Sequence, residues 1–121
     1  MAVRQPQWSP DAKQIAFGAD MPGKRMHVFI VSADGGVPKE VTKGERDELF
    51  PNWSQDGNSL FFGNGRIELA GVPASAIYRL NLRTNQFTTL SGSEGTWFPR
   101  LHRMTTTSPL FLTLIILCCL R

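Results

Sequence analysis

The chain contains two copies of one sequence unit. Residues 6–17, which read PQWSPDAKQIAF, recur as residues 51–62, which read PNWSQDGNSLFF. Trp8 and Trp53 are therefore 45 residues apart, a period typical of proteins that stack one structural unit. Because such a unit buries its apolar face only against a neighbouring unit, this repeat constrains the fold more than any single residue does.

The copying continues beyond the tryptophan motif. Residues 28–42 align with residues 77–91, and the extra four residues of the second copy fall in the loop before this segment, where repeats tolerate insertions. Pro99 follows Pro51 by 48 residues, which predicts that a third unit begins near Phe98. We therefore expect two repeats, at about residues 5–50 and 51–98.

Each unit has the pattern of β structure. Residues 14–19 and 59–64 are short apolar runs flanked by turn residues, and residues 77–82 alternate as a half-buried strand does. Residues 26–32 are nearly all apolar, as in a strand buried on both faces. Hairpin turns are expected at residues 34–36 and 83–85. The predicted fold class is all-β.

The linked motifs W-S-P-D-x-K-x-I-A-F, V-x-x-D-G-G-x-P-x-x-V-T and F-P-x-W-S-x-D-G resemble the TolB-like (WD-type) bacterial β-propeller repeat over residues 5–100. The resemblance implies four-stranded antiparallel blades around an axis, of which two repeats make an incomplete propeller. Ala12 replaces the usual glycine of the turn, and Gln55 replaces the usual proline. Residues 83–85 replace the Asp-Gly-Gly turn.

The residues that carry the repeat are interpreted as structural. Asp side chains in tight turns bond their own backbone, glycine accepts positive φ, and tryptophans at equivalent repeat positions are expected in the blade core. The structural motif comprises Trp8, Ser9, Pro10 and Asp11, then Trp53, Ser54, Asp56 and Gly57, and the turn residues Asp34, Gly35 and Gly36.

No catalytic constellation is present in the sequence. Residues 92–95 lack the spacing of a G-x-S-x-G nucleophile elbow, and no glycine-rich phosphate loop precedes a helix. His27 is expected at the edge of a strand, and His102 falls in the unusual tail. The sequence therefore predicts no enzyme activity and no catalytic residue in this chain.

No metal or cofactor site is predicted either. A D-x-D-x-D run of calcium ligands surrounds neither Asp11 nor Asp56, and the adjacent Cys118 and Cys119 lack the spacing of a zinc site. The acidic loop of Glu45, Asp47 and Glu48 is expected to be solvated.

The charge distribution argues against nucleic acid as a partner. The formal net charge is +3, but the basic residues are scattered rather than clustered on one segment. Trp8, Trp53 and Trp97 could stack on bases, yet two of them occupy equivalent core positions of the repeat. We expect a protein or peptide partner.

The resemblance implies a non-catalytic module for protein or peptide interaction or for sensing. The alternative is the propeller portion of a prolyl-oligopeptidase-like serine hydrolase, whose chemistry lies in another domain, and a third context is a sensor attached to a winged-helix regulator. Residues 1–5 carry no secretory signal. A periplasmic or extracytoplasmic location is expected if the parent protein is TolB-like or a membrane sensor.

Residues 101–121 form an aberrant tail. Read in the frame that starts on the last base of each codon, residues 101–109 can encode Ser-Pro-Asp-Asp-polar-polar-Ile-Ala, which matches residues 9–16. The hypothesis is an out-of-frame third repeat, and the coding DNA at residues 101–104 tests it. The rival interpretation is membrane contact through residues 110–120, but this apolar run is shorter than the ~20 residues of a spanning helix.

Two blades alone leave sheet faces without a neighbour. Each blade buries its face against the next one, so the outer faces and strand edges of a pair stay open to water. The apolar tail adds a further aggregation liability. The sequence therefore predicts a chain that is prone to self-association.

Overall fold

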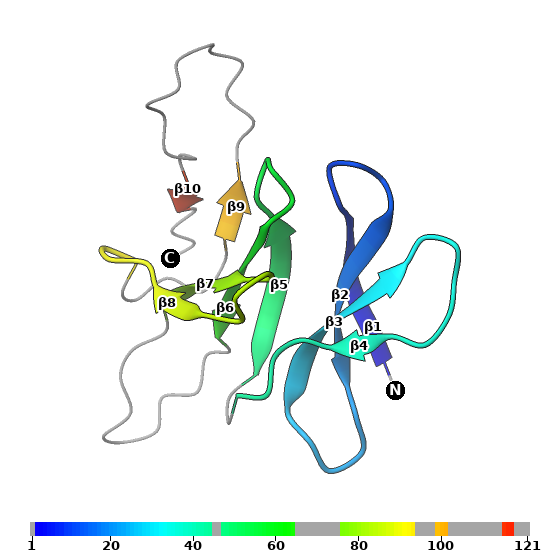
Figure 1. Cartoon of the computed structure of the whole chain (residues 1–121). Helices are drawn as coiled ribbons and strands as arrows, with labels where there is room; N and C mark the ends of the chain where they lie inside the picture. The colour runs from blue at the N-terminus through cyan, green and yellow to red at the C-terminus, as the bar shows by residue number, and fades with distance from the viewer. Residues whose placement is uncertain (1, 45–46, 65–75, 94–98, 102–114, 118–121) are drawn as a thin grey trace.

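The computed structural model describes residues 2–44, 47–64, 76–93, 99–101 and 115–117 (Figure 1). The described residues form strands joined by turns and loops. In chain order the strands are β1 (Ala2–Trp8), β2 (Gln14–Asp20), β3 (Met26–Ser32), β4 (Lys39–Glu40), β5 (Glu48–Trp53), β6 (Ser59–Asn64), β7 (Ile77–Asn81), β8 (Phe87–Thr89), β9 (Pro99–Leu101) and β10 (Ile115–Leu117).

Two four-stranded antiparallel sheets, each with its strands in chain order, make up most of the structure. Strands β1 to β4 form the first sheet and β5 to β8 form the second. Strands β3 and β6 have the ranges expected from the sequence, and β2 extends its expected range by one residue. The predicted all-β fold with four-stranded antiparallel blades is confirmed.

Both sheets carry the same irregularity in their first strand. The pairing of β1 with β2 shifts register between Arg4 and Gln7, and that of β5 with β6 shifts between Leu49 and Asn52. Gln5 and Phe50, at equivalent positions of the repeat, have positive φ values of 54° and 58°. The two first strands are therefore bulged in the same way, although no glycine occupies either position.

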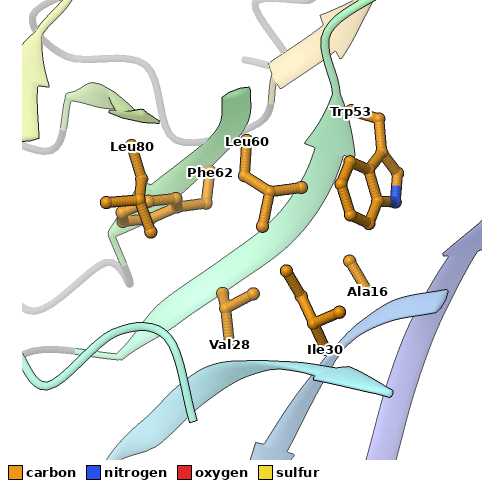
Figure 2. Close-up of a cluster of buried hydrophobic side chains, with 7 residues drawn as sticks. All are labelled: Ala16, Val28, Ile30, Trp53, Leu60, Phe62 and Leu80. Atoms are coloured by element: carbon orange, nitrogen blue, oxygen red, sulfur yellow. The ribbon is translucent and has the colours of Figure 1, made fainter. Parts of the chain in front are cut away.

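The main core lies between the two sheets. Figure 2 shows Ala16, Val28 and Ile30 of the first sheet pointing toward a set of side chains from the second sheet. That set consists of Trp53, Leu60, Phe62 and Leu80, and all seven side chains are buried. The apolar side chains of β2 and β6 thus lie in a face-to-face contact of the two sheets, which is how blades stabilise one another.

The residues at the predicted start of a third unit form β9. This strand contacts β5 and β6, as β5 contacts β1 and β2 (Figure 1). Strand β10 pairs with β9 in antiparallel register, so residues 115–117 of the apolar tail are a strand. The frame hypothesis and most of residues 110–120 lie outside the described residues.

Candidate functional site

The repeated Ser-x-Asp turn has the same hydrogen bonds in both blades. In the first blade the Ser9 hydroxyl donates to Asp11 Oδ1 at 2.6 Å, and Asp11 Oδ1 also accepts from Lys13 N at 3.0 Å. Gln14 N donates to the Ser9 hydroxyl at 2.9 Å, which closes the turn between β1 and β2. Pro10 lies at the exposed outer position of this turn.

The second blade repeats this arrangement. The Ser54 hydroxyl donates to Asp56 Oδ1 at 2.5 Å, and Asn58 N donates to the same oxygen at 2.9 Å. In both copies the serine hydroxyl is the main cause of a lowered aspartate pKa, followed by the backbone N–H. Asp11 and Asp56 therefore stabilise their turns as carboxylates.

The two copies of this turn differ at the position that is usually glycine. Gly57 has a φ of 72°, and Ala12, its counterpart, has a φ of 58°. The left-handed region is costly for a residue with a Cβ atom. Ala12 is therefore a strained substitution in an otherwise intact turn.

The turns after β3 and β7 both require residues with positive φ, and the two blades use different residues there. Gly35 and Gly36 have φ values of 96° and 109°, and Gly35 N donates to Ser32 O at 3.0 Å. Asp34 N donates to the Ser32 hydroxyl at 3.2 Å. In the second blade Asn81 Oδ1 caps the turn and Asn85 takes the positive φ, at 56°.

The two repeat tryptophans differ in burial. Trp53 is 8% exposed and belongs to the core between the blades, as expected. Trp8 is 59% exposed, so the expectation that it also lies in the core was wrong for this chain. The reason is positional, because Trp53 faces the first sheet, whereas the equivalent face of the first sheet has no described sheet upon it.

Two hydrogen bonds link the first strands of the neighbouring blades. The Trp53 indole Nε1 donates to the Gln7 carbonyl at 3.0 Å. Phe50 N donates to Gln5 Oε1 at 3.1 Å, so one bulged strand is bonded to the other. Both contacts depend on the packing of one blade on the other, and no local sequence pattern predicts either of them.

A polar cluster fixes the linker between the blades. His27 on β3 contacts the Glu40 carboxylate through Nδ1 and the Gly44 carbonyl through Nε2, at 2.5 and 3.0 Å. Because both ring nitrogens face oxygen acceptors, both bonds form together when each nitrogen carries a hydrogen. The His27 hydrogen bond holds the pKa of Glu40 below its usual range.

The acidic loop is more than a solvated segment, which corrects the expectation from the sequence. Asp47 Oδ1 accepts from Met26 N at 2.9 Å, and Asp47 Oδ2 lies 3.9 Å from Arg25 Nη1. Glu48 is buried, and burial raises the pKa of its carboxyl group. Glu48 Oε2 has no hydrogen-bond partner among the described residues. Glu45 lies outside the described residues.

A cleft of about 400 Å³ opens where the first strands of the two blades approach each other. Its lining comes from β1, the β2–β3 hairpin and β5, and includes the bulged positions Gln5 and Phe50. Two basic and two acidic side chains lie around it. The lining residues are Arg4, Gln5, Asp20, Lys24, Met26, Asp47, Leu49 and Phe50. Bulges redirect side chains at strand ends, so this cleft between the two bulged strands is a candidate for ligand contact.

Metal sites and membrane-spanning helices were also sought among the described residues. Within the residues that the structure describes, no group of three or more His, Cys, Asp or Glu side chains is placed to hold a metal ion. The described part of the chain also has no helix long and apolar enough to span a membrane. His27 has both ring nitrogens engaged, by Glu40 and by the Gly44 carbonyl.

Solved structures with similar folds include two TolB proteins and an oligogalacturonate lyase. A TolB from Acinetobacter baumannii matches with a TM-score of 0.66 and 25% identity, over 83% of this chain and 24% of its own. A putative TolB from Agrobacterium tumefaciens matches at 0.62 and 23%, over 78% and 36%. An oligogalacturonate lyase in complex with manganese matches at 0.55 and 22%, over 84% and 26%.

Sequence relatives carry peptidase names. An uncharacterized peptidase, YuxL, from Bacillus subtilis is 36% identical over 55 residues, which are 46% of this chain and 8% of the relative. Dipeptidyl-peptidase 5 from Porphyromonas endodontalis is 29% identical over 59 residues, 45% of this chain and 8% of the relative. No family model matches the chain. The chain therefore spans less than a tenth of these relatives and about a quarter to a third of the similar structures.

The fold defines the class of protein. Two antiparallel four-stranded sheets that pack face to face, with a repeated Ser-x-Asp turn, are blades of a β-propeller. More particularly, its fold is similar to that of the TolB structures, which share this arrangement over about four-fifths of its length.

Proposed function

We propose that this pair of blades is a non-catalytic recognition module that binds a protein or peptide segment. The observation that carries the proposal is the cleft between β1 and β5, where side chains of both charges surround two bulged strands. In this proposal the repeats at residues 5–50 and 51–98 each supply one blade. The tryptophan, serine and aspartate motif residues hold the scaffold and contact no ligand.

The lining of the cleft favours a charged, extended segment as its ligand. Arg4 and Lys24 offer positive charge, while Asp20 and Asp47 offer negative charge a short way along the same cleft. Leu49 and Met26 add an apolar surface. Complementary charges of this kind fix register and orientation, while the apolar contact supplies affinity.

Peptide binding in solution tests the proposal. Fluorescence polarisation with labelled acidic, basic and mixed-charge peptides is expected to find a binder whose affinity falls with salt. Lys24→Glu should weaken that binding about tenfold, whereas Lys39→Glu, on β4 and outside the cleft, should not. If no peptide binds below about 1 mM, or if both variants weaken binding equally, the cleft is not the recognition site.

The second candidate is the propeller portion of a prolyl-oligopeptidase-like serine hydrolase. The observation that favours it is that both curated relatives are named as peptidases. The blades would then lie beside a catalytic domain and supply no catalytic residue themselves. Sequencing the gene downstream of these blades tests this candidate, because it requires a domain with a G-x-S-x-G nucleophile elbow.

A periplasmic or extracytoplasmic location belongs to the same proposal. Its support is the likeness to TolB structures. Cell fractionation of the full-length gene product tests it, and recovery of that product only from the cytoplasm would contradict it.

A further inference from the structure

The cleft between β1 and β5 lies on the faces by which the two blades pack together. Arg4 lies opposite Gly18 in the register of β1 and β2, and Gly18 lies opposite Val28 in that of β2 and β3. Residues opposite each other share a face, and Val28 belongs to the core between the blades. Arg4 is therefore on the face of the first sheet that is turned toward the second blade, and both walls of the cleft come from these two blades.

The two carboxylates of the cleft already bond the backbone. Asp20 Oδ1 accepts from Ala2 N at 2.6 Å. Asp47 Oδ1 accepts from Met26 N at 2.9 Å, and its Oδ2 lies 3.9 Å from Arg25 Nη1. Both side chains are half-buried. These carboxylates hold the ends of neighbouring strands together, which leaves fewer of their lone pairs for a ligand.

The hydrogen bond from Phe50 fixes the orientation of the Gln5 amide. The donor is a backbone N–H at 3.1 Å, so the amide atom that it meets must be the oxygen. Gln5 Nε2 then carries two N–H donors, and no described residue accepts from them. Because Gln5 lines the cleft and is half-buried, its amide offers donors there rather than an acceptor.

The two basic side chains of the cleft lining are also donors. Arg4 and Lys24 are exposed, and within the part of the chain that the structure describes neither side chain forms a hydrogen bond or an ion pair. Lys24 acts only at longer range on Glu40, whose lowered pKa comes mainly from the His27 hydrogen bond. The polar groups of the lining that have no partner are therefore donors, and two of them are cationic.

The backbone at the cleft has an unfavourable conformation in both blades. Gln5 and Phe50 have φ values of 54° and 58°, in the left-handed region that is costly for residues with a Cβ atom. Residues held in this region cluster at sites of ligand contact, where the surrounding structure enforces the conformation. The strain recurs at the matching position of both repeats, which supports a binding role for the two bulges.

We propose that the cleft binds an acidic peptide segment through the carboxylate groups of its Asp or Glu side chains, an inference that rests on the recognition role proposed above. The Arg4 guanidinium can hold a carboxylate through two parallel N–H bonds, and Lys24 adds a point charge. The Gln5 amide donates to a further oxygen of the ligand. A basic segment would meet two like charges instead, which disfavours its binding.

Fluorescence polarisation with three peptides of equal length, one acidic, one neutral and one basic, tests the ligand class. The acidic peptide should bind at least about tenfold more tightly than the other two. This preference should shrink as salt is added, because salt screens exposed charges.

Gln5→Glu is the sharpest variant, since it keeps an oxygen for Phe50 N and replaces the N–H donors with a second carboxylate oxygen. It should weaken binding of the acidic peptide at least about tenfold. Gln7→Glu is the matched control, because Gln7 is exposed on the same strand, lies outside the cleft lining and undergoes the same chemical change. Arg4→Gln, at an exposed side chain, is a second variant that should also weaken binding, and circular dichroism checks the fold of each.

The possible failures are distinguishable. A neutral or basic peptide that binds as tightly as the acidic one would overturn the acidic class, and if Lys24→Glu changes that affinity the recognition role still stands. If none of the three peptides binds below about 1 mM, the recognition role falls as well. Equal effects of Gln5→Glu and Gln7→Glu, or unchanged binding in folded Gln5→Glu and Arg4→Gln, would show that the carboxylate does not bind in this cleft.

Discussion

The indole Nε1 of Trp53 donates a hydrogen bond to the backbone carbonyl of Gln7, the residue that precedes the equivalent tryptophan of the other blade. This 3.0 Å bond joins two copies of one motif across the blade boundary. It explains why the tryptophan suits this position, since the ring fills the apolar contact and its single polar atom reaches an acceptor.

Replacement of Trp53 should therefore destabilise the chain more than replacement of Trp8. We expect Trp53→Phe to lower the free energy of unfolding by about 1–2 kcal/mol, through the lost hydrogen bond and packing. Trp8→Phe should change it by less than about 0.5 kcal/mol, because Trp8 is 59% exposed. Urea denaturation of dilute samples measures both, and equal effects would contradict the structural difference between the two positions.

Relief of the strained turn should stabilise the first blade. Ala12 has a φ of 58°, where a Cβ atom costs about 1–2 kcal/mol. Ala12→Gly should raise the free energy of unfolding by up to about 1 kcal/mol, since the greater freedom of glycine in the unfolded chain offsets part of the gain. Gly57→Ala in the other blade is the reciprocal variant and should destabilise it. A thermal shift of the same sign for both variants would contradict this account.

Neutralisation of Glu48 should stabilise the chain at neutral pH. Burial raises the pKa of this carboxyl group, so the folded state favours the protonated form and loses stability as the pH rises through that pKa. Glu48→Gln should gain about 1 kcal/mol at pH 7, and the gain should shrink as the pH falls through the raised folded pKa and be absent below about pH 4.

Glu40 provides the opposite case for comparison. His27 lowers the pKa of Glu40, so this carboxylate contributes stability above its unfolded pKa and loses it as the pH falls. Glu40→Gln should therefore destabilise the chain at pH 7 and have little effect near pH 3. Urea midpoints measured from pH 3 to pH 8 give both profiles, and profiles of the same sign would refute the assignment.

The Asp56 turn should also weaken in acid. The Ser54 hydroxyl and the Asn58 N–H lower the pKa of Asp56, so the contribution of its carboxylate is present above about pH 4 and lost as the pH falls through the folded value. Asp56→Asn should cost less than about 1 kcal/mol at pH 7, because the side chain is exposed. The cost should vanish at low pH, and a pH-independent difference would contradict an ionic origin.

The amino-acid sequence by itself determined the repeat, most of the strands and the tight turns. These features depend on residues that are near each other in the chain. The Ser9 and Asp11 side chains close their turn with bonds spanning two to five residues, and the short apolar run of β2, flanked by turn residues, predicts a strand. The same local chemistry recurs in the second blade, so the all-β architecture could be predicted.

Only the tertiary structure decided which residues at matching repeat positions are buried and which are exposed. Trp8 and Trp53 share one motif, but the neighbouring sheet covers one and leaves the other exposed. The cleft at Gln5 and Phe50, and the burial of Glu48, likewise depend on segments that only blade packing brings together. Burial and pKa are properties of the surroundings, and in a stacked fold those surroundings come from another repeat.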